Sequence, residues 1–123
     1  MKKILIVDDE ADVCDFVKGF FEERGFEVLM ALSGTEALRV VKKQKPGLIL
    51  LDIKMKGIDG IETLKRIRAV DKCVNVMMVT AADDQRTMDA ADKLGACKYI
   101  SKPLVLENLE FAVMSFTKGV KSA

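Results

Sequence analysis

The sequence predicts an α/β fold, a doubly wound five-stranded parallel sheet with helices on both faces. Short runs of large aliphatic residues recur along the chain without the alternation of a half-exposed strand, which is typical of strands buried on both faces. Between these runs, apolar residues recur at the three- and four-residue spacing of amphipathic helices. Strands and helices that alternate in this way favour parallel strands joined by right-handed crossovers, in a (βα)5 order.

The strands are the most distinct elements. We expect them at residues 4–7, 26–32, 48–52, 74–79 and 97–101. The third, Leu48 to Asp52, is the most continuous, and it ends in a carboxylate that is costly to bury unless water, a metal or a paired charge receives it. Glu27 makes the second strand less apolar and indicates a place nearer an edge of the sheet.

The first two helices have clear ends. An apolar stripe in the first helix predicts the residues that face the core, namely Val13, Phe16, Val17, Phe20 and Phe21. The acids from Asp8 to Asp12 lie at its start, where the helix dipole favours them, and Gly25 stops it. Ser33 and Glu36 have the spacing of a capping box, in which each side chain accepts a bond from the other's backbone N–H. This second helix ends before Pro46.

The last three helices differ in how much apolar surface they offer. The first of them follows a loop at residues 54–59 and has a cap-like start at Asp59. The next spans residues 84–94, with Asp83 or Asp84 as its cap. The inward-facing residues expected in the three helices are Ile61, Leu64 and Ile67; Met88, Ala91 and Leu94; and Leu106, Leu109, Val113 and Phe116. Because the helix at 84–94 has so little apolar area to bury, we expect it to be loosely held.

Composition excludes several classes of function. The chain has no histidine, which rules out Ser-His-Asp and Cys-His catalysis, His-ligated zinc and a histidine phosphocarrier role. The three cysteines lie far apart with no CxxC pair, so we interpret them as reduced thiols of a cytoplasmic protein. The net charge of +1 argues against a nucleic-acid surface. No apolar run approaches the ~20 residues of a membrane span.

Polar side chains follow four of the expected strands. Asp8 and Asp9 follow the first, Asp52 ends the third, Thr80 follows the fourth and Lys102 the fifth. In doubly wound sheets the site lies beyond the carboxyl ends of the strands. Each of these residues alone is ordinary as a cap, a strand residue or a solvated charge. Their combination predicts one site with three acids, a hydroxyl and a cation.

The residue types at this edge favour phosphoryl chemistry. Three carboxylates in one pocket repel one another, and a single Lys does not neutralise them. Hard oxygen ligands suit Mg²⁺, which prefers one or two carboxylates together with a phosphate. A carboxylate beside such a metal can itself attack a phosphoryl group, with Thr80 and Lys102 holding the phosphoryl oxygens.

In these residues the chain resembles the response-regulator receiver domains of two-component signalling, and among them the chemotaxis-regulator-like domains. The resemblance rests on Asp8-Asp9, Asp52, Thr80-Ala81 and Lys102-Pro103, each directly after a strand. It covers essentially all of residues 1–123, as a single receiver domain without an output domain. It implies a flavodoxin-like sheet with strand order 2-1-3-4-5.

The resemblance implies a metal site and a phosphoacceptor. Asp52 is expected to accept the phosphoryl group. Asp9, Asp52 and the backbone carbonyl of Lys54 are expected to bind Mg²⁺, with Asp8 acting through water.

A switch is implied in the same way. Thr80 and Lys102 are expected to bind the phosphoryl group, and Tyr99 resembles a switch aromatic that turns inward when Thr80 moves. The peptide bond before Pro103 is expected to be cis.

Four positions depart from the common pattern of that family. Lys56 stands where the loop after the phosphoacceptor often carries Pro, and Val105 stands where the last helix often has a polar cap. Lys54 and Ala82 occupy the two positions that tune access of water, and neither side chain can orient it. We therefore expect slow self-hydrolysis of the phosphorylated form, unless Lys54 pairs with the phosphate instead.

The implied function is a signalling switch, not an enzyme. A sensor histidine kinase or phosphotransfer protein would phosphorylate Asp52, and the surface of the helix at 84–94, the fifth strand and the last helix would regulate a downstream protein or output domain. We expect no membrane contact and no direct binding of nucleic acid.

Three alternatives stay open. An aspartate-nucleophile phosphatase would usually carry a second acid where this chain has Lys54, and a flavodoxin-like cofactor binder would need a phosphate-binding loop. The third is a receiver-like scaffold that cannot be phosphorylated. The sequence also leaves open whether the chain acts alone or within a longer regulator.

Overall fold

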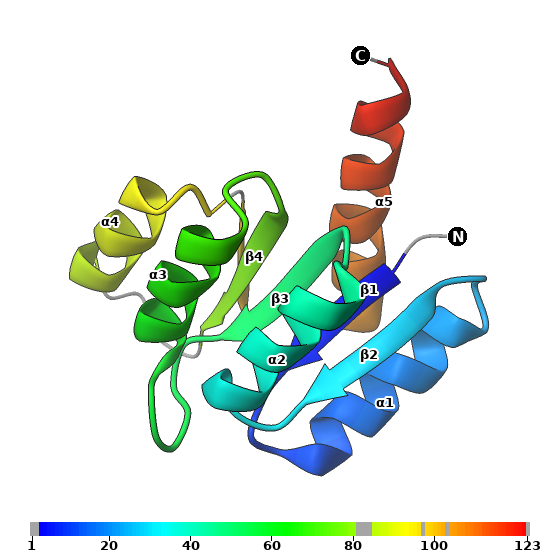
Figure 1. The fold of residues 1–123 in the computed structure, drawn as a ribbon. Coiled ribbons are helices and arrows are strands. Elements are labelled where there is room, and N and C mark those ends of the chain that lie inside the picture. The colour runs from blue at the N-terminus through cyan, green and yellow to red at the C-terminus, as the bar shows by residue number, and fades with distance from the viewer. Residues whose placement is uncertain (1–2, 81–84, 97, 103, 123) are drawn as a thin grey trace.

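A five-stranded parallel sheet lies between two layers of helices (Figure 1). The structure is a computed structural model that describes residues 3–80, 85–96, 98–102 and 104–122, with side chains up to residue 115. The strands are β1 (Lys3–Val7), β2 (Glu27–Ala31), β3 (Leu48–Asp52), β4 (Asn75–Thr80) and β5 (Lys98–Ser101). Their order is β2-β1-β3-β4-β5, so the doubly wound α/β fold and its implied strand order are confirmed.

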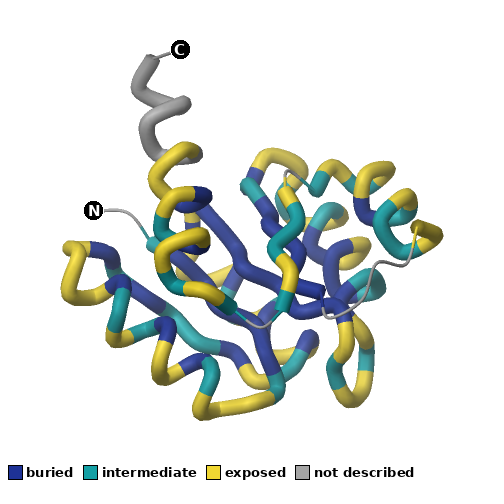
Figure 2. The backbone as a smooth tube through the Cα atoms, turned by 180° about the vertical axis from the view of Figure 1, so that it is seen from behind, coloured by how far each residue is buried: buried dark blue, intermediate teal, exposed yellow. Residues whose placement is uncertain are grey.

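The helices divide between the two faces of the sheet. They are α1 (Ala11–Glu22), α2 (Gly34–Gln44), α3 (Gly60–Val70), α4 (Gln85–Lys93) and α5 (Leu106–Ser122). Buried residues of α1 and α5 pack in one hydrophobic layer, whereas those of α2, α3 and α4 pack in the other. Figure 2 shows the consequence, a buried backbone through the sheet and exposed backbone on the outer sides of the helices.

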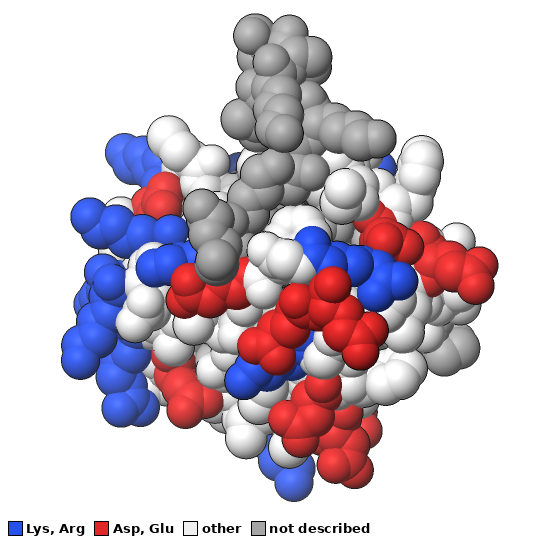
Figure 3. Space-filling model, turned by 90° about the vertical axis from the view of Figure 1, so that its right-hand side faces the viewer, with Lys and Arg blue, Asp and Glu red and all other residues white. Residues whose placement is uncertain are grey.

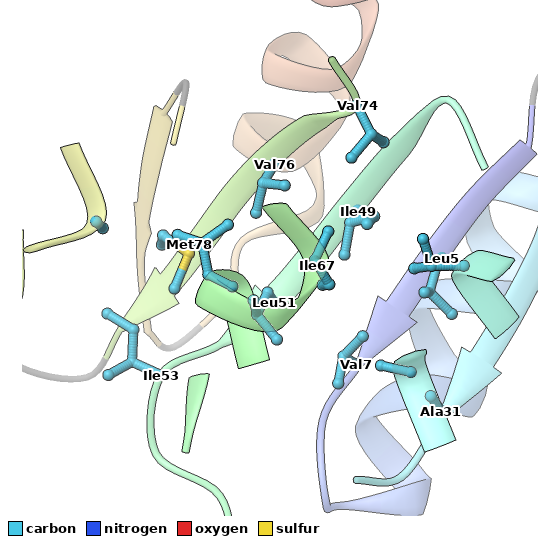
Figure 4. Packing of buried hydrophobic residues seen from close by; sticks show 14 residues of the cluster. Leu5, Val7, Ala31, Ile49, Leu51, Ile53, Ile67, Val74, Val76 and Met78 are labelled. Atoms are coloured by element: carbon cyan, nitrogen blue, oxygen red, sulfur yellow. The ribbon is translucent and has the colours of Figure 1, made fainter. Parts of the chain in front are cut away.

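Each strand contributes to both layers, because successive side chains point to opposite faces of a sheet. In β1, Leu5 and Val7 join the layer under α2 and α3, which Figure 4 shows from close by. Ile4 and Ile6 join the layer under α1 and α5. The strand β3 is buried along its whole length, as its unbroken aliphatic run predicts.

Side-chain caps begin two of the helices. Ser33 Oγ accepts a bond from Glu36 N at 3.1 Å, and Asp59 Oδ1 accepts one from Glu62 N at 2.9 Å. The reciprocal half of the predicted capping box is shifted by one residue, because Glu36 Oε1 accepts from the backbone N–H of Leu32 instead of that of Ser33. The backbone is extended at Ser33, so the Glu36 side chain reaches past that residue to the N–H of Leu32.

The apolar stripe of α1 is narrower than the sequence predicts. Val17 and Phe21 are fully buried, Val13 and Phe20 are half-buried, and Phe16 is 61% exposed. Phe16 was therefore wrongly predicted to face the core. A stripe of five residues spans more of the helix surface than the sheet covers, and Phe16 lies at its outer margin.

The helix α4 is held mostly by polar bonds. Ala91 is its one buried residue in the part of the chain that the structure describes. At its C-terminal end, the Arg68 guanidinium of α3 donates to the carbonyl oxygens of Leu94 at 2.6 Å and Gly95 at 2.9 Å. The small buried area agrees with the prediction that this helix is loosely held.

Several predicted features fall outside the described residues. They are the caps Asp83 and Asp84, Ala82, Cys97, the cis bond at Pro103 and the side chain of Phe116. Across the residues that are described, none of the helices is both long and apolar enough to span a bilayer.

Candidate functional site

Three carboxylates meet at the carboxyl edge of the sheet. Asp8 and Asp9 directly follow β1, and Asp52 is the last residue of the neighbouring strand β3. One oxygen from each carboxylate lies within 4.8 Å of the others. Asp8 and Asp52 are 3% and 4% exposed, while Asp9 is half-buried. The predicted convergence of the three acids is thus present in the structure.

Each carboxylate is oriented by a backbone N–H. Asp8 Oδ1 accepts from Glu10 N at 2.9 Å, and Asp52 Oδ1 accepts from Lys54 N at 3.3 Å. Asp9 Oδ2 accepts from the N–H of Lys56, a loop residue, at 3.1 Å. These bonds fix one oxygen of each acid, and the second oxygen of Asp8 and of Asp52 is paired with Lys102.

The Lys102 ammonium lies between the two buried acids. Its Nζ is 3.0 Å from Asp52 Oδ2 and 3.4 Å from Asp8 Oδ2. The backbone N–H of Lys102 donates to the Thr80 carbonyl oxygen at 2.8 Å, which holds the end of β5 beside β4.

Burial and charge shift the pKa values of this ion pair. Burial raises the pKa of Asp52 and the charge of Asp8 raises it further, so these effects outweigh the bond from Lys102. Burial alone would lower the pKa of Lys102, but the bond and the charges of Asp52 and Asp8 raise it overall. The ammonium therefore stays charged, and Asp52 carries its negative charge at a cost.

Thr80 and Tyr99 lie on the neighbouring strands β4 and β5, and Tyr99 pairs with Met78, two residues before Thr80. Thr80 ends β4, is 8% exposed and pairs with Ser101 of β5. The Tyr99 hydroxyl bonds to the Asp92 carboxylate of α4 and lies 2.8 Å from the Met88 carbonyl oxygen. Burial raises the pKa of Tyr99, and the neighbouring Asp92 adds to that shift, so the hydroxyl keeps its proton. Tyr99 thus ties β5 to α4 in this structure.

The pattern of residue types in the sequence does not predict two groups that contribute hydrogen bonds to the site. The buried Cys14 thiol donates to the Asp8 carbonyl oxygen at 3.5 Å, and burial together with the charge of Asp8 raises its pKa to about 12. The thiol therefore stays protonated and acts as a donor beneath β1. The other contributor is the Lys56 N–H, which belongs to the backbone.

A groove of about 240 Å³ opens beside the acids, lined by Glu10, Val13, Phe16, Lys102 and Leu104. It explains where the exposed Phe16 ring lies. Farther out, Lys and Arg side chains gather along one side of the face in Figure 3, and Asp and Glu side chains occupy its middle. This face is therefore not a continuous basic surface.

The donor set fits a hard divalent cation. The three acids present oxygen atoms within reach of one ion, and Lys102 supplies only one compensating positive charge. Mg²⁺ prefers such carboxylate oxygens and keeps waters or a phosphate in its remaining positions. Lys54 follows Asp52 two positions later and donates its backbone N–H to that acid, so its own carbonyl is close in the chain to Asp52.

Known proteins are similar to this chain in sequence and fold. Residues 4–114 match the family model of the response regulator receiver domain. The chain is 35% identical over 115 residues to sporulation initiation phosphotransferase F of Bacillus subtilis, covering 94% of this chain and 93% of that protein. It is 38% identical over 107 residues to the transcriptional regulatory protein ZraR of Escherichia coli, which is 87% of this chain and 24% of the relative.

Among solved structures, the chain is similar to the response regulator protein TrrA of Thermotoga maritima in complex with Mg²⁺ and BeF. The TM-score is 0.83 at 32% identity, and the similarity covers 94% of this chain and 98% of that one.

Proposed function

The chain belongs to the response regulator receiver domain family, and from that membership we propose that it is a phosphorylatable switch in a two-component phosphorelay. Receiver domains of this family are signalling modules. The observation that best supports the proposal is Asp52, a buried carboxylate that shares one pocket with two further acids and an ammonium 3.0 Å away.

The site residues have distinct roles in this proposal. Asp52 is the phosphoacceptor. Asp9, Asp52 and the Lys54 backbone carbonyl would hold Mg²⁺, and Asp8 would act through water. When bound, Mg²⁺ supplies positive charge beside the oxygens of the transferring phosphoryl group.

Phosphoryl transfer to Asp52 needs a nucleophile and a place for the new charge. The phosphodonor is a phosphohistidine on a sensor histidine kinase or a phosphotransfer protein. An Asp52 oxygen attacks phosphorus, the P–N bond breaks as the P–O bond forms, and the histidine nitrogen keeps the electron pair and takes up a proton. Lys102, already bonded to Asp52, and the nearby Thr80 hydroxyl then hold the phosphoryl oxygens.

The added charge then biases the contacts around α4. If Thr80 and Lys102 turn to the phosphoryl group, the β4 and β5 ends shift, and Tyr99 leaves Asp92 and the Met88 carbonyl. Because α4 buries so little apolar surface, these few polar bonds decide its position. The surface of α4, β5 and α5 is then the output surface for a downstream protein or output domain.

One experiment tests the proposal. The protein is incubated with Mg²⁺ and acetyl phosphate, and its intact mass is measured. We expect one added phosphoryl group, lost in Asp52→Asn and in excess EDTA, and retained in Asp15→Asn, which alters an exposed acid of α1 outside the cluster.

Other results would favour the remaining candidates. Continuous release of phosphate from several monoesters would favour an aspartate-nucleophile phosphatase. Absence of labelling under all conditions would favour a scaffold that cannot be phosphorylated.

A further inference from the structure

The loop after β3 is fastened to the acid cluster through its backbone. Residues 53–59 turn sharply at Gly57, which has a φ of +80°. The loop closes on itself where Gly60 N donates to the Ile53 carbonyl oxygen at 2.7 Å. Within this closed loop, the N–H groups of Lys54 and Lys56 both point to acids of the cluster.

The Lys56 bond differs from the others because it joins the loop after β3 to the residues that follow β1. Lys56 N lies 3.1 Å from Asp9 Oδ2, although the two residues are 47 positions apart in the chain. The bonds on Asp8 and Asp52 come from residues only two positions away. Asp9 is also the most exposed of the three acids, so less packing holds its side chain in place.

We propose that the backbone N–H of Lys56 is a positioning group for the metal site. It orients Asp9 toward the cation and keeps the loop that carries the Lys54 carbonyl beside the acids. This inference rests on the proposed function, in which Asp9 and the Lys54 carbonyl bind Mg²⁺.

The chemistry of the bond supports this role. A carboxylate has two acceptor oxygens, so a bond on Oδ2 of Asp9 leaves Oδ1 for a cation. Hydrogen bonds to ligating carboxylates fix their orientation, and their loss typically costs about 10- to 100-fold in metal affinity. The bond uses the main chain, so every residue type except Pro can make it at position 56.

Two substitutions separate the N–H from the side chain. Lys56→Pro removes the N–H, whereas Lys56→Ala keeps it and removes only an exposed ammonium. By isothermal titration with Mg²⁺, we expect Lys56→Pro to bind about tenfold more weakly than wild type. Lys56→Ala should bind at least as tightly as wild type, since it removes a positive charge near the cation.

Equal affinities for Lys56→Pro and Lys56→Ala would overturn the inference while leaving the proposed function intact. Absence of Mg²⁺ binding by the wild-type protein would overturn the proposed function and the inference with it.

Amide hydrogen exchange provides a second measurement that does not depend on how well the Pro variant folds. In the metal-free protein, Asp9→Ala should speed exchange of the Lys56 amide and leave that of Lys54, bonded to Asp52, unchanged. Unchanged exchange at Lys56 would overturn the inference, because it would mean that Asp9 does not hold this N–H in solution.

Discussion

The start of α3 lies directly against the backbone of the phosphoacceptor strand, and Gly60 is the residue that permits it. A Cβ added at Gly60 would lie 2.3 Å from the Asp52 carbonyl oxygen and 2.6 Å from Ile53 Cα. Both neighbours are backbone atoms, which cannot rotate away as a side chain can. We therefore predict that Gly60→Ala pushes α3 and the end of β3 apart.

The size of the effect follows from the overlap. An ordinary contact begins near 3.4 Å, so the carbonyl contact is too short by roughly 1 Å. Overpacking of this kind costs about 1–3 kcal/mol, and weakening the 2.7 Å bond from Gly60 N to Ile53 adds about 1 kcal/mol. The higher helix propensity of Ala offsets less than about 1 kcal/mol of this loss. We expect a net loss of about 1–4 kcal/mol of unfolding free energy.

Urea denaturation measures this loss, with Gly19→Ala as the matched control. A Cβ at Gly19, on the exposed side of α1, would meet no atom within 4 Å. That variant should gain about 0.5–1 kcal/mol from helix propensity. Acetyl phosphate labelling of Gly60→Ala should also slow by about 100-fold, since a shift of about 1 Å misplaces Asp52. If Gly60→Ala were as stable as Gly19→Ala, the close approach of α3 to β3 would be refuted.

Three further predictions concern charge, polar anchoring and packing. Because burial raises the pKa of Asp52, folding favours its protonated form, and this stabilisation is lost as pH rises through that pKa. In EDTA at pH 7, Asp52→Asn should therefore have a larger free energy of unfolding than wild type in urea denaturation. Arg68→Ala removes bonds to four backbone carbonyls and should cost about 2–3 kcal/mol in urea denaturation, with faster amide exchange in α4. Phe21→Ala should cost about 3–5 kcal/mol and Phe16→Ala less than about 0.5 kcal/mol in the same assay.

Each of these has an outcome that contradicts it. A destabilised Asp52→Asn would mean that the bond to Lys102 outweighs burial. Unchanged exchange in α4 of Arg68→Ala would mean that its C-terminal end is held by other contacts. Similar losses for Phe16→Ala and Phe21→Ala would place Phe16 in the core after all.

Much of the fold follows from local patterns. The strand β3 was predicted at its observed limits because four aliphatic residues in a row suit only a position buried on both faces. Asp59 was predicted as a cap because its carboxylate can reach an N–H three residues on, and it does. The acids of the site were predicted together because parallel strands bring their carboxyl ends to one edge. The strand order itself came from the resemblance to receiver domains.

The features that the sequence did not predict all depend on how closely elements far apart in the chain approach one another in the fold. The periodicity of apolar residues in α1 predicts a stripe but does not show how much of that stripe the sheet covers. For this reason Phe16 was predicted to face the core. The sequence around Arg68 gives no sign that the C-terminal end of α4 lies close enough to accept hydrogen bonds from the Arg68 guanidinium. The bond from Lys56 N to Asp9 joins backbone to side chain across 47 positions, which no side-chain pattern reveals.

The acid cluster exists only in the folded chain, because Asp8 and Asp9 meet Asp52 through the pairing of β1 with β3. An unfolded or partly folded chain holds no such cluster and has no comparable affinity for a cation. Any cation that binds there therefore shifts the folding equilibrium, by about 2.7 kcal/mol at a concentration 100 times its dissociation constant. The abundance of the folded protein and the occupancy of its site then rise and fall together with the free concentration of that ion.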